Sequence, residues 1–261
     1  MNSTLELLAN RHSVRAFSEQ PITPEERQAI LQATFRAPTA GNQMLYAIIE
    51  VDDPAVKQRL VETCDHQPFI AKAPLVLVFL ADYQRWFDAF MHGGVRERCA
   101  AVGQEFRMPG PGDLFLASCD ALIAAQTAVV AAESLGIGSC YIGDILENYE
   151  IHREMFNLPR YTFPVTMVCF GHPAPLTHQR RIPRFPEEFI LHRNTYRRFG
   201  PEEQEAMFQP LMAARPSGHT FPEGVENIAQ SLFFRKYVAP FSYEMTRSVE
   251  AMLKNWTPEE D

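Results

Sequence analysis

The sequence predicts an α+β protein in which helices dominate. Apolar runs of strand length at 74–80 and 164–171 indicate two buried strands, and the first reads as a central strand covered on both faces. The segment 113–135 is apolar nearly all round, which is typical of a helix inside a core or a dimer interface. Because strands and helices do not alternate strictly, the chain does not fit a βαβ pattern.

Two capping signals open the chain. The capping box at 3–6 (STLE) predicts a short helix with Leu5 and Leu8 facing inward. The box at 23–26 (TPEE), with proline at the first helical position, predicts a second helix, and Pro38 stops it. We therefore expect two helices before the first strand.

The elements that follow are a loop, a strand, a helix and an excursion. Residues 38–43 are turn formers and side-chain amides and predict a loop. A strand is expected at 46–51 and a helix at 54–63. Residues 82–112 mix aromatic residues with glycine and proline clusters, which indicates an irregular excursion before the long helix.

The last third changes character. Asp144–Glu147 predicts the cap of a further helix, and residues 172–186 are rich in proline and arginine. Amphipathic helical pieces are expected at 204–212, 225–238 and 241–256. They carry too little apolar surface for a core of their own, so we expect residues 187–261 to wrap around another subunit.

Composition bounds the function. The chain has 261 residues, of which 46% are hydrophobic and 21% charged, and this composition suits a soluble globular protein. A net charge of −8 argues against a nucleic-acid partner. Five dispersed cysteines without a CxxC pair, no signal peptide and a longest apolar run of only 73–81 predict a cytoplasmic protein that does not enter a membrane.

The sequence lacks the motifs of several common binding and catalytic sites. The chain has no phosphate-binding P-loop, no complete dinucleotide fingerprint, no G-x-S-x-G nucleophile turn and no histidine or cysteine spacing typical of zinc. We therefore expect no metal site and no side-chain nucleophile. The chemistry is expected to depend on an organic cofactor.

The most informative segment is Arg11-His12-Ser13-Val14-Arg15. In an extended chain residues 11, 13 and 15 point the same way, so two guanidinium groups and a hydroxyl share one side. That set of donors suits a phosphate group. On its own the segment also fits a solvated, charged start of a domain, and what favours phosphate binding is the set of motifs that follows it.

Five motifs occur in a fixed order along the chain. They are RHSVR at 11–15, APTAGNQ at 37–43, QPFIA at 67–71, ESLGIG at 133–138 leading into YIG at 141–143, and RFP at 184–186. In this order and at these intervals the series resembles the nitroreductase family of FMN flavoproteins, especially its larger members. The resemblance implies a nitroreductase-like α+β fold, with a central, mostly antiparallel sheet flanked by helices. It also implies an intertwined homodimer with two FMN sites at its interface, a core at 1–186 with a lid excursion at 82–112, and an extension at 187–261 that wraps the partner.

The resemblance also assigns roles to individual residues. Arg11, Ser13, Arg15 and Arg184 are implied to grip the FMN phosphate, with His12 contributing mainly its backbone. The loop residues Pro38, Thr39 and Asn42 are implied to reach the flavin of the other subunit, and Gln67 to bond the ribityl chain or ring edge. The turn Tyr141, Ile142 and Gly143 is implied to lie under the isoalloxazine ring. Glycine there permits close approach of the backbone, although it also fits a plain helix N-terminus.

One departure from the family concerns charge. Some relatives have a lysine two residues before the last phosphate-binding arginine, and this chain has Ile182 there. Arg180 or Arg181 is a candidate replacement. We also expect an arginine of the 180–184 cluster to stabilise the reduced flavin.

The expected activity is a ping-pong hydride transfer. NAD(P)H reduces the flavin at N5, and the flavin then reduces a nitroaromatic, a quinone or a free flavin. Three alternatives stay open at this stage. They are a specialised enzyme of the same fold, such as one for flavin fragmentation or reductive dehalogenation, a flavin-binding module without turnover, and a helical protein whose basic segment binds a phosphorylated partner.

Overall fold

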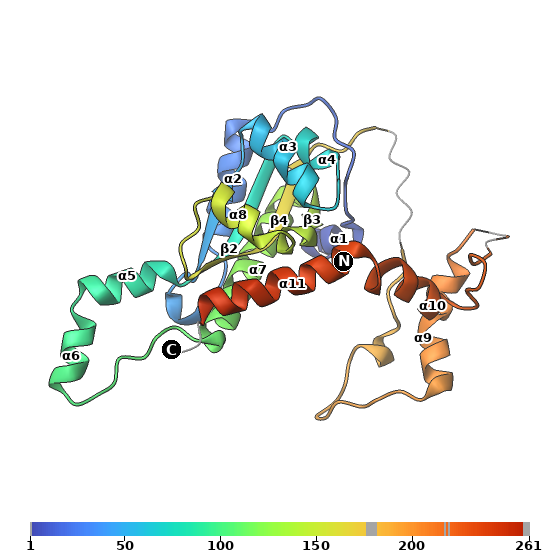
Figure 1. Ribbon diagram of the computed structural model, residues 1–261. Helices are drawn as coiled ribbons and strands as arrows, with labels where there is room; N and C mark the ends of the chain where they lie inside the picture. The colour runs from blue at the N-terminus through green and yellow to red at the C-terminus, as the bar shows by residue number, and fades with distance from the viewer. Residues whose placement is uncertain (1, 176–181, 217, 219, 258–261) are drawn as a thin grey trace. The chain divides into compact units, whose positions relative to one another are not determined.

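The computed structural model describes residues 2–175, 182–216, 218 and 220–257 (Figure 1). The chain forms two compact units, the first comprising residues 1–177 and 244–261 and the second residues 178–243. The sequence predicts a boundary at 186/187, between a cofactor-binding core and an extension that wraps around the partner subunit. That functional division stays a prediction.

The first unit is built on a four-stranded antiparallel sheet with the order β1-β2-β4-β3. The strands are β1 (Tyr46–Glu50), β2 (Leu75–Asp82), β3 (Gly138–Ile142) and β4 (Thr162–Gly171). Every residue of β2 is buried, as its unbroken apolar sequence predicts for a strand covered on both faces.

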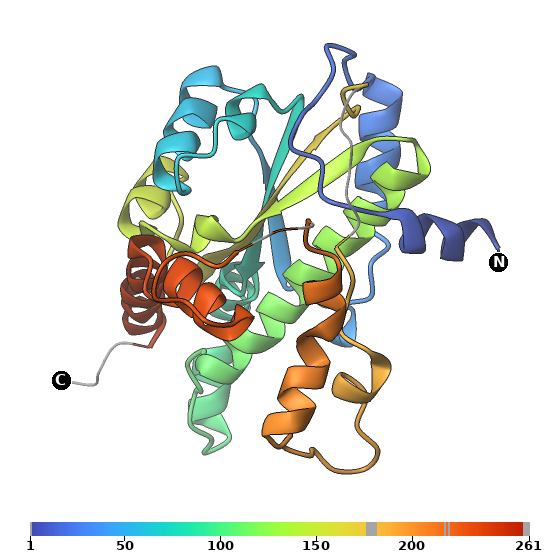
Figure 2. The same cartoon turned by 90° about the vertical axis from the view of Figure 1, so that its right-hand side faces the viewer.

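Alternating side chains of the sheet enter two separate cores. On one face Val76, Val78 and Leu80 of β2 pack with α3 (Pro54–Thr63) and α4 (Phe69–Lys72). On the other face Leu75, Leu77 and Phe79 pack against α2 and α7. Figures 1 and 2 show the sheet between these two layers of helices.

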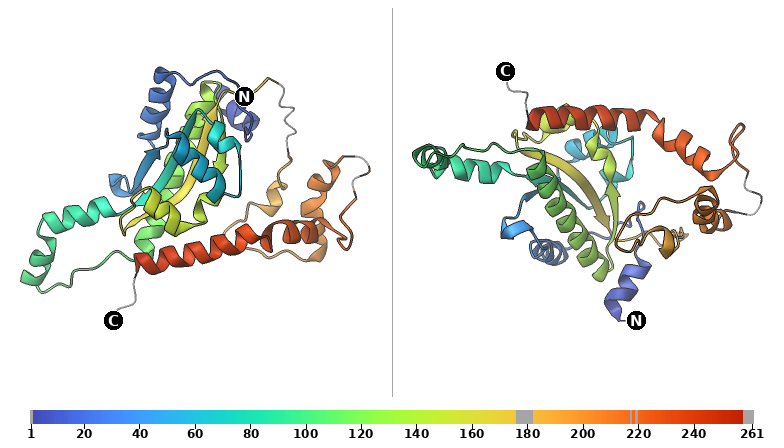
Figure 3. Two further views of the ribbon diagram at one scale, coloured as in Figure 1. Left: turned by 45° about the horizontal axis from the view of Figure 1, so that its top comes forward. Right: turned by 90° about the horizontal axis from the view of Figure 1, so that it is seen from below.

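The remaining helices of the first unit have these bounds. They are α1 (Ser3–Asn10), α2 (Pro24–Thr34), η1 (Ala40–Asn42), α5 (Gln84–His92), α6 (Val95–Ala101), α7 (Pro111–Ser134), η2 (Gly143–Leu146), α8 (Tyr149–Met155) and most of α11 (Pro240–Trp256). The excursion that the sequence suggested to be irregular is partly helical, because α5 and α6 occupy most of its first half. Both helices project away from the sheet (Figure 3).

The long helix α7 has two different faces. On one face Val129 and six alanines are fully buried against the sheet, namely Ala117, Ala121, Ala124, Ala125, Ala128 and Ala132. On the other face Phe115, Leu116, Leu122 and Ile123 are exposed. By length and composition alone α7 could cross a membrane, but its alanine face belongs to the core beneath the sheet. We therefore assign it as a core helix with an apolar outer face.

The second unit consists of short helices and connecting loops. They are η3 (Glu187–Phe189), α9 (Pro201–Ala213), α10 (Ile228–Leu232), the π-helical turn Phe233–Tyr237 and the start of α11. Their positions agree with the helical pieces that the amphipathic pattern predicts.

The first helix departs from expectation in two respects. Asn2, rather than Ser3, is its N-cap, and the Asn2 side chain accepts a hydrogen bond from the Leu5 backbone N–H. Leu5 and Leu8 do not face inward but are 51% and 46% exposed. A capping box and a short apolar spacing do not reveal whether a surface exists nearby to cover that face.

Candidate functional site

Two glycines hold the basic segment, which we define as Arg11–Arg15, against the sheet. Gly138 of β3 and Gly171 of β4 lie directly opposite each other in the sheet. A Cβ on Gly138 would lie 2.4 Å from a Val14 methyl group, and one on Gly171 would lie 2.6 Å from the Phe17 ring. The glycines therefore leave the space into which Val14 and Phe17 pack.

Backbone hydrogen bonds fix the same segment. Val14 N–H donates to the Ser139 carbonyl at 2.8 Å, and Ser13 forms a parallel bridge with Ser139. Further along, Ser18 N–H donates to the His172 carbonyl at 2.8 Å. Because Val14 is buried, its neighbours Ser13 and Arg15 point outward, as the alternation in the sequence predicts.

The guanidinium groups of this segment converge on β3. Both Arg11 and Arg15 lie close enough to Cys140 to oppose the rise in the pKa of its thiol that burial causes. Ser13 also contacts that thiol. Among the described residues no carboxylate forms an ion pair with Arg11 or Arg15. In a protein of net charge −8, two arginines of one short segment that form no ion pair with a described carboxylate are suited to an external anion.

Unpartnered polar atoms lie at the same edge of the sheet. The Ser139 hydroxyl and His12 Nε2 are buried without a hydrogen-bond partner among the described residues, and so is Glu133 Oε1. The His12 Nδ1 atom donates to the Asn10 carbonyl at 3.0 Å, which fixes the ring. Buried polar groups normally have partners, so these atoms are candidates for hydrogen bonds with a polar ligand.

The loop 38–44 is held by a buried carboxylate of α7. Asp120 accepts hydrogen bonds from the Thr39 hydroxyl, from Ala40 N–H at 3.0 Å and from Leu45 N–H at 3.1 Å. The Thr39 oxygen also accepts from Met44 N–H at 2.8 Å. Thr39 is thus engaged within its own chain, whereas Pro38 and Asn42 are exposed. That these loop residues reach a partner's flavin stays a prediction.

Gln67 has one free hydrogen-bonding atom. Its side-chain N–H groups donate to the Cys64 carbonyl at 3.2 Å and to Asp144 Oδ2 at 2.6 Å. A carboxylate can only accept, so the contact with Asp144 assigns the amide orientation. The carbonyl oxygen, Gln67 Oε1, is left for a ligand. A ligand at this position must therefore supply the donor.

The turn after β3 contains a glycine that the fold does not require. A Cβ on Gly143 would meet nothing within 4 Å, and its backbone φ lies outside the left-handed region. Neither packing nor strain therefore explains the glycine, but an external group against the backbone would. Ile142, which precedes Gly143, is buried. The Tyr141 hydroxyl donates to Gln126 at 3.2 Å, and burial raises the pKa of Tyr141 to about 12.

Arg184 and the neighbouring basic residues lie in the second unit. Arg184 and Ile182 are exposed there, and the convergence of Arg184 with the basic segment stays a prediction. Arg180 and Arg181 lie outside the described residues.

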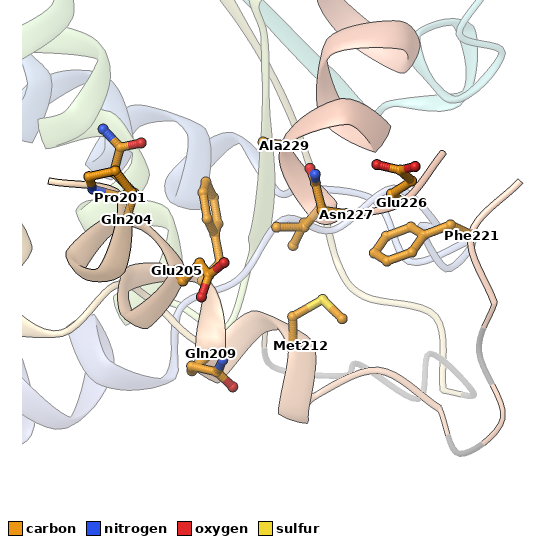
Figure 4. Close-up of a pocket in the computed structure, with 11 residues that line it drawn as sticks. Pro201, Gln204, Glu205, Gln209, Met212, Phe221, Glu226, Asn227 and Ala229 are labelled. Carbon is orange, nitrogen blue, oxygen red and sulfur yellow. The ribbon is translucent and has the colours of Figure 1, made fainter. Parts of the chain in front are cut away.

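A cavity of about 370 Å³ in the second unit lies between α9 and residues 221–229, with Met212 and Phe221 projecting into it (Figure 4). None of the residues assigned to the flavin lines it.

A second cavity lies in the excursion. It has a volume of about 400 Å³, and four aromatic side chains contribute to its lining, namely Tyr83, Phe87, Phe90 and Phe106. The excursion is fixed at its base, where the Trp86 indole N–H donates to the Gln43 carbonyl at 2.8 Å and Phe87 packs on Tyr161. The excursion thus contributes an aromatic wall that begins next to the 38–44 loop.

The sequence interpretation overlooked three supports of this site. Asp120 had a detectable signal, because it is an acidic residue within an otherwise apolar stretch of a long helix. Gly138 was noted only within a motif, although its pairing with Val14 decides where the basic segment lies. The prediction that Asp144 caps a further helix was wrong, because Asp144 lies inside the 3₁₀ turn η2 and the next helix, α8, has Asn148 as its N-cap. The Asp144 carboxylate instead orients Gln67, and no local pattern reveals a contact across 77 positions.

Comparisons with known proteins agree with this geometry. The family model described as the nitroreductase family matches residues 8–172. The chain is 33% identical over 196 residues to the FMN reductase (NADPH) of Bacillus subtilis, covering 75% of each protein. It is 34% identical over 191 residues to an NADPH-dependent oxidoreductase of Staphylococcus epidermidis, covering 73% of each.

The fold has close structural neighbours as well. The structure of B. megaterium NfrA2 superposes with a TM-score of 0.77 at 27% identity, covering 98% of both chains. This chain belongs to the nitroreductase family. The recognition made from its five motifs is confirmed, and so is the nitroreductase-like α+β fold.

The cofactor of the family fits the residues present. FMN needs cations for its phosphate, hydrogen-bonding groups for its ribityl chain and ring edge, and a backbone surface for its flat ring. Arg11 and Arg15 are unpaired among the described residues, Gln67 Oε1 is free, and Gly143 faces open space. The donor set therefore suits a flavin mononucleotide.

Proposed function

We propose that this chain is an FMN-dependent oxidoreductase that uses NAD(P)H to reduce small electron-poor molecules. The observation that carries the proposal is the pair of guanidinium groups at Arg11 and Arg15, which form no ion pair with a described carboxylate and which the Val14–Gly138 contact fixes beside β3. The Glu133 carboxyl group lies near Arg11, whose charge opposes the rise in the Glu133 pKa that burial causes. Relatives named as FMN reductases and NADPH-dependent oxidoreductases support it. When bound, FMN supplies the hydride chemistry in two half-reactions, first accepting from NAD(P)H and then reducing a nitroaromatic, a quinone or a free flavin.

The chain's own residues bind and orient in this scheme. Arg11, Ser13 and Arg15 hold the phosphate through charge-assisted hydrogen bonds, with Arg184 as a further cation. Gln67 Oε1 accepts a hydrogen bond from the ribityl chain or ring edge, and the backbone at Gly143 supports the ring. No side chain is required as an acid or base, because the proton and electron chemistry belongs to the cofactor.

The functional unit is proposed to be a homodimer. The exposed apolar side chains of α7 (Phe115, Leu116, Leu122 and Ile123) and of α1 (Leu5 and Leu8) are suited to burial against a second copy of the chain. Covering this face with a second copy brings the loop 38–44 toward the partner's flavin, and residues 187–261 wrap around the partner. We place the enzyme in the cytoplasm.

The acceptor is proposed to bind against the aromatic wall of the excursion. Planar aromatic molecules stack favourably on such side chains. The spread of acceptors that the enzyme takes is therefore expected to depend on residues 82–112.

The visible spectrum of the purified protein tests the cofactor and the donor. We expect flavin absorbance in the protein as isolated or after addition of FMN, and bleaching of that absorbance by NADPH or NADH without oxygen. Reoxidation by menadione or nitrofurazone then shows turnover. A colourless protein that takes up no FMN contradicts the proposal, and a yellow protein that neither donor reduces indicates a binding module without turnover.

The dimer has its own test. Ile123→Arg places a charge on the outer face of α7, and light scattering is expected to show a monomer. Val102→Arg is the matched control, because Val102 is similarly exposed but lies in the excursion. A dimer that survives Ile123→Arg unchanged contradicts this interface.

A further inference from the structure

Glu147 has surroundings that the proposed function does not explain. It follows η2, the single 3₁₀ turn that begins at Gly143, and only 6% of its surface is exposed. Its Oε1 atom is buried without a hydrogen-bond partner among the described residues. An ionised carboxylate in such a place is costly unless a cation or several donors face it.

The groups that face Glu147 carry negative charge or none. Asp144 is three residues earlier, where side chains of a 3₁₀ turn stand on the same face, and the two carboxyl groups contact each other. Asp65 approaches from the loop before α4, and Glu244 from α11. Burial, followed by the charges of Asp144, Asp65 and Glu244, raises the pKa of Glu147 to about 8.

The remaining neighbours do not offset this charge. The Cys64 thiol is buried beside Glu147, and its pKa is raised by burial. The His152 ring contacts the Glu147 backbone, but burial lowers the pKa of His152 to about 4, so this ring is neutral near pH 7. Arg247 is engaged by Glu244 and Glu150 at 2.8 Å each. A protonated Glu147 therefore fits the site best, since it can donate to Asp144.

We propose that Glu147 is a positioning residue of the flavin site, which acts as the neutral, hydrogen-donating member of a carboxyl pair with Asp144. With Glu147 neutral, Asp144 stays in place to accept from Gln67 Nε2 at 2.6 Å. That hydrogen bond turns Gln67 Oε1 outward, toward a donor on the ligand. The inference rests on the proposed function, because it takes FMN as the ligand that Gln67 meets.

The pair makes cofactor binding sensitive to pH. When Glu147 loses its proton, two carboxylates meet in a buried place and repel each other. Asp144 then moves away from Glu147, and its hydrogen bond with Gln67 weakens. The loss affects one neutral hydrogen bond, the one between Gln67 Oε1 and the ligand. We therefore expect the FMN dissociation constant to rise about five-fold between pH 7 and pH 9. The phosphate of FMN stays a dianion throughout this range.

The experiment measures FMN binding to the apoprotein from the quenching of flavin fluorescence, at intervals between pH 7 and pH 9. The wild-type protein should show a transition near pH 8. Glu147→Gln keeps a neutral donor, so its dissociation constant should match that of the wild type at pH 7 and stay constant to pH 9. Gln67→Leu removes the group through which the pair acts, and should bind FMN more weakly at pH 7 without a transition.

Glu150→Gln is the matched control. Glu150 is a nearby glutamate whose pKa is lowered to about 2 by its hydrogen bonds with Arg247, so it does not titrate in this range. It should keep the wild-type transition. A transition that persists in Glu147→Gln or in Gln67→Leu overturns the positioning role while leaving the proposed function intact. If the wild-type protein binds no FMN at any pH, the proposed function fails and this inference with it.

Discussion

The two ends of strand β3 lie next to groups of opposite charge, guanidinium groups at its start and carboxyl groups after its end. At its start, near Gly138 and Ser139, the basic segment brings two guanidinium groups that form no ion pair with a described carboxylate. At its end, after Ile142, Asp144 and Glu147 bring two carboxyl groups together where no described cation faces Glu147. Five residues of strand therefore separate an exposed positive site from a buried acidic one.

Solvent access explains the difference. Arg15 is exposed, so its charge costs little before a ligand arrives and is available to an anion. Glu147 is buried, so the lowest free energy is reached by keeping its proton rather than by finding a counter-ion. We therefore expect the residues at the start of β3 to contribute affinity for FMN, and those after its end to orient the Gln67 side chain. Substitutions at the two ends should separate these contributions.

The largest change in FMN affinity is expected at the positive end of β3. Arg15→Ala removes a charge-assisted contact with the FMN phosphate, and we expect the dissociation constant to rise roughly 30- to 150-fold, equivalent to about 2–3 kcal/mol. Arg11→Ala should act in the same direction. Fluorescence quenching with the apoprotein measures both, and the loss should shrink as salt is added.

Arg59→Ala is the control for this experiment. Arg59 is an exposed arginine that pairs with Glu62 on α3, away from the basic segment. It should leave FMN affinity unchanged. Equal losses in Arg59→Ala and Arg15→Ala would show that general charge, rather than the geometry at β3, attracts the cofactor.

A carboxylate with a full set of donors provides the next contrast. Asp120 is as buried as Glu147 but accepts three hydrogen bonds from the loop 38–45. Asp120→Ala leaves two backbone N–H groups without an acceptor, so we expect a loss of about 2–4 kcal/mol in the free energy of unfolding, measured in urea. Asp120→Asn retains one acceptor oxygen and should lose less. If the alanine variant is as stable as the wild type, Asp120 does not anchor the loop.

The sequence predicted the positive end far better than the acidic one. RHSVR is a local pattern, and its alternation predicts that residues 11, 13 and 15 share one side. In the structure Val14 is buried, whereas Ser13 and Arg15 are exposed. The strands 46–50, 75–82 and 162–171 were also expected within a few residues, because apolar runs report burial directly. The strand at 138–142 was not recognised as such, since the motif there suggested a turn.

Long-range contacts account for what the sequence could not predict. Burial and the charge of Asp144 raise the pKa of Glu147, and so do the charges of Asp65 and Glu244, which come from distant parts of the chain. The exposure of Leu5 and Leu8 depends on which surfaces lie nearby rather than on their own spacing. Residues whose role depends on several distant neighbours leave no periodic signal in one sequence.

Two glycines of β3 and its turn offer a smaller, matched test. Gly138→Ala places a methyl group against Val14, whose side chain is fixed in the core, so we expect about 1–3 kcal/mol of destabilisation and weaker FMN binding. Gly143→Ala adds its methyl group in open space and should leave the free energy of unfolding unchanged. It should still weaken FMN binding, because the proposed position of the flavin ring is against this backbone. Thermal unfolding of the apoprotein and FMN titration together separate the two results, and normal FMN affinity in Gly143→Ala would place the ring elsewhere.

The smallest expected effect is the pH dependence of stability at the acidic end. The pKa of Glu147 is raised from the ordinary value of 4.5 to about 8, so between these values the folded protein keeps a proton that the unfolded chain releases. Stability from this group is fully present below pH 4.5, falls as the pH rises toward 8 and is level above it. Glu147→Gln cannot release a proton, so relative to its value near pH 4.5 it should gain roughly 1–3 kcal/mol over the wild type by pH 8.

Glu150→Gln should show the opposite sign. The pKa of Glu150 is lowered to about 2 by Arg247, so its contribution is present above pH 4.5 and is lost as the pH falls toward 2. That variant should therefore be slightly less stable than the wild type at pH 7 and approach it in acid. Urea unfolding at about pH 3, 5, 6.5 and 8 measures both variants. If the free energies of unfolding of the wild type and Glu147→Gln change in parallel with pH, Glu147 is ionised in the folded protein and does not keep its proton near pH 7.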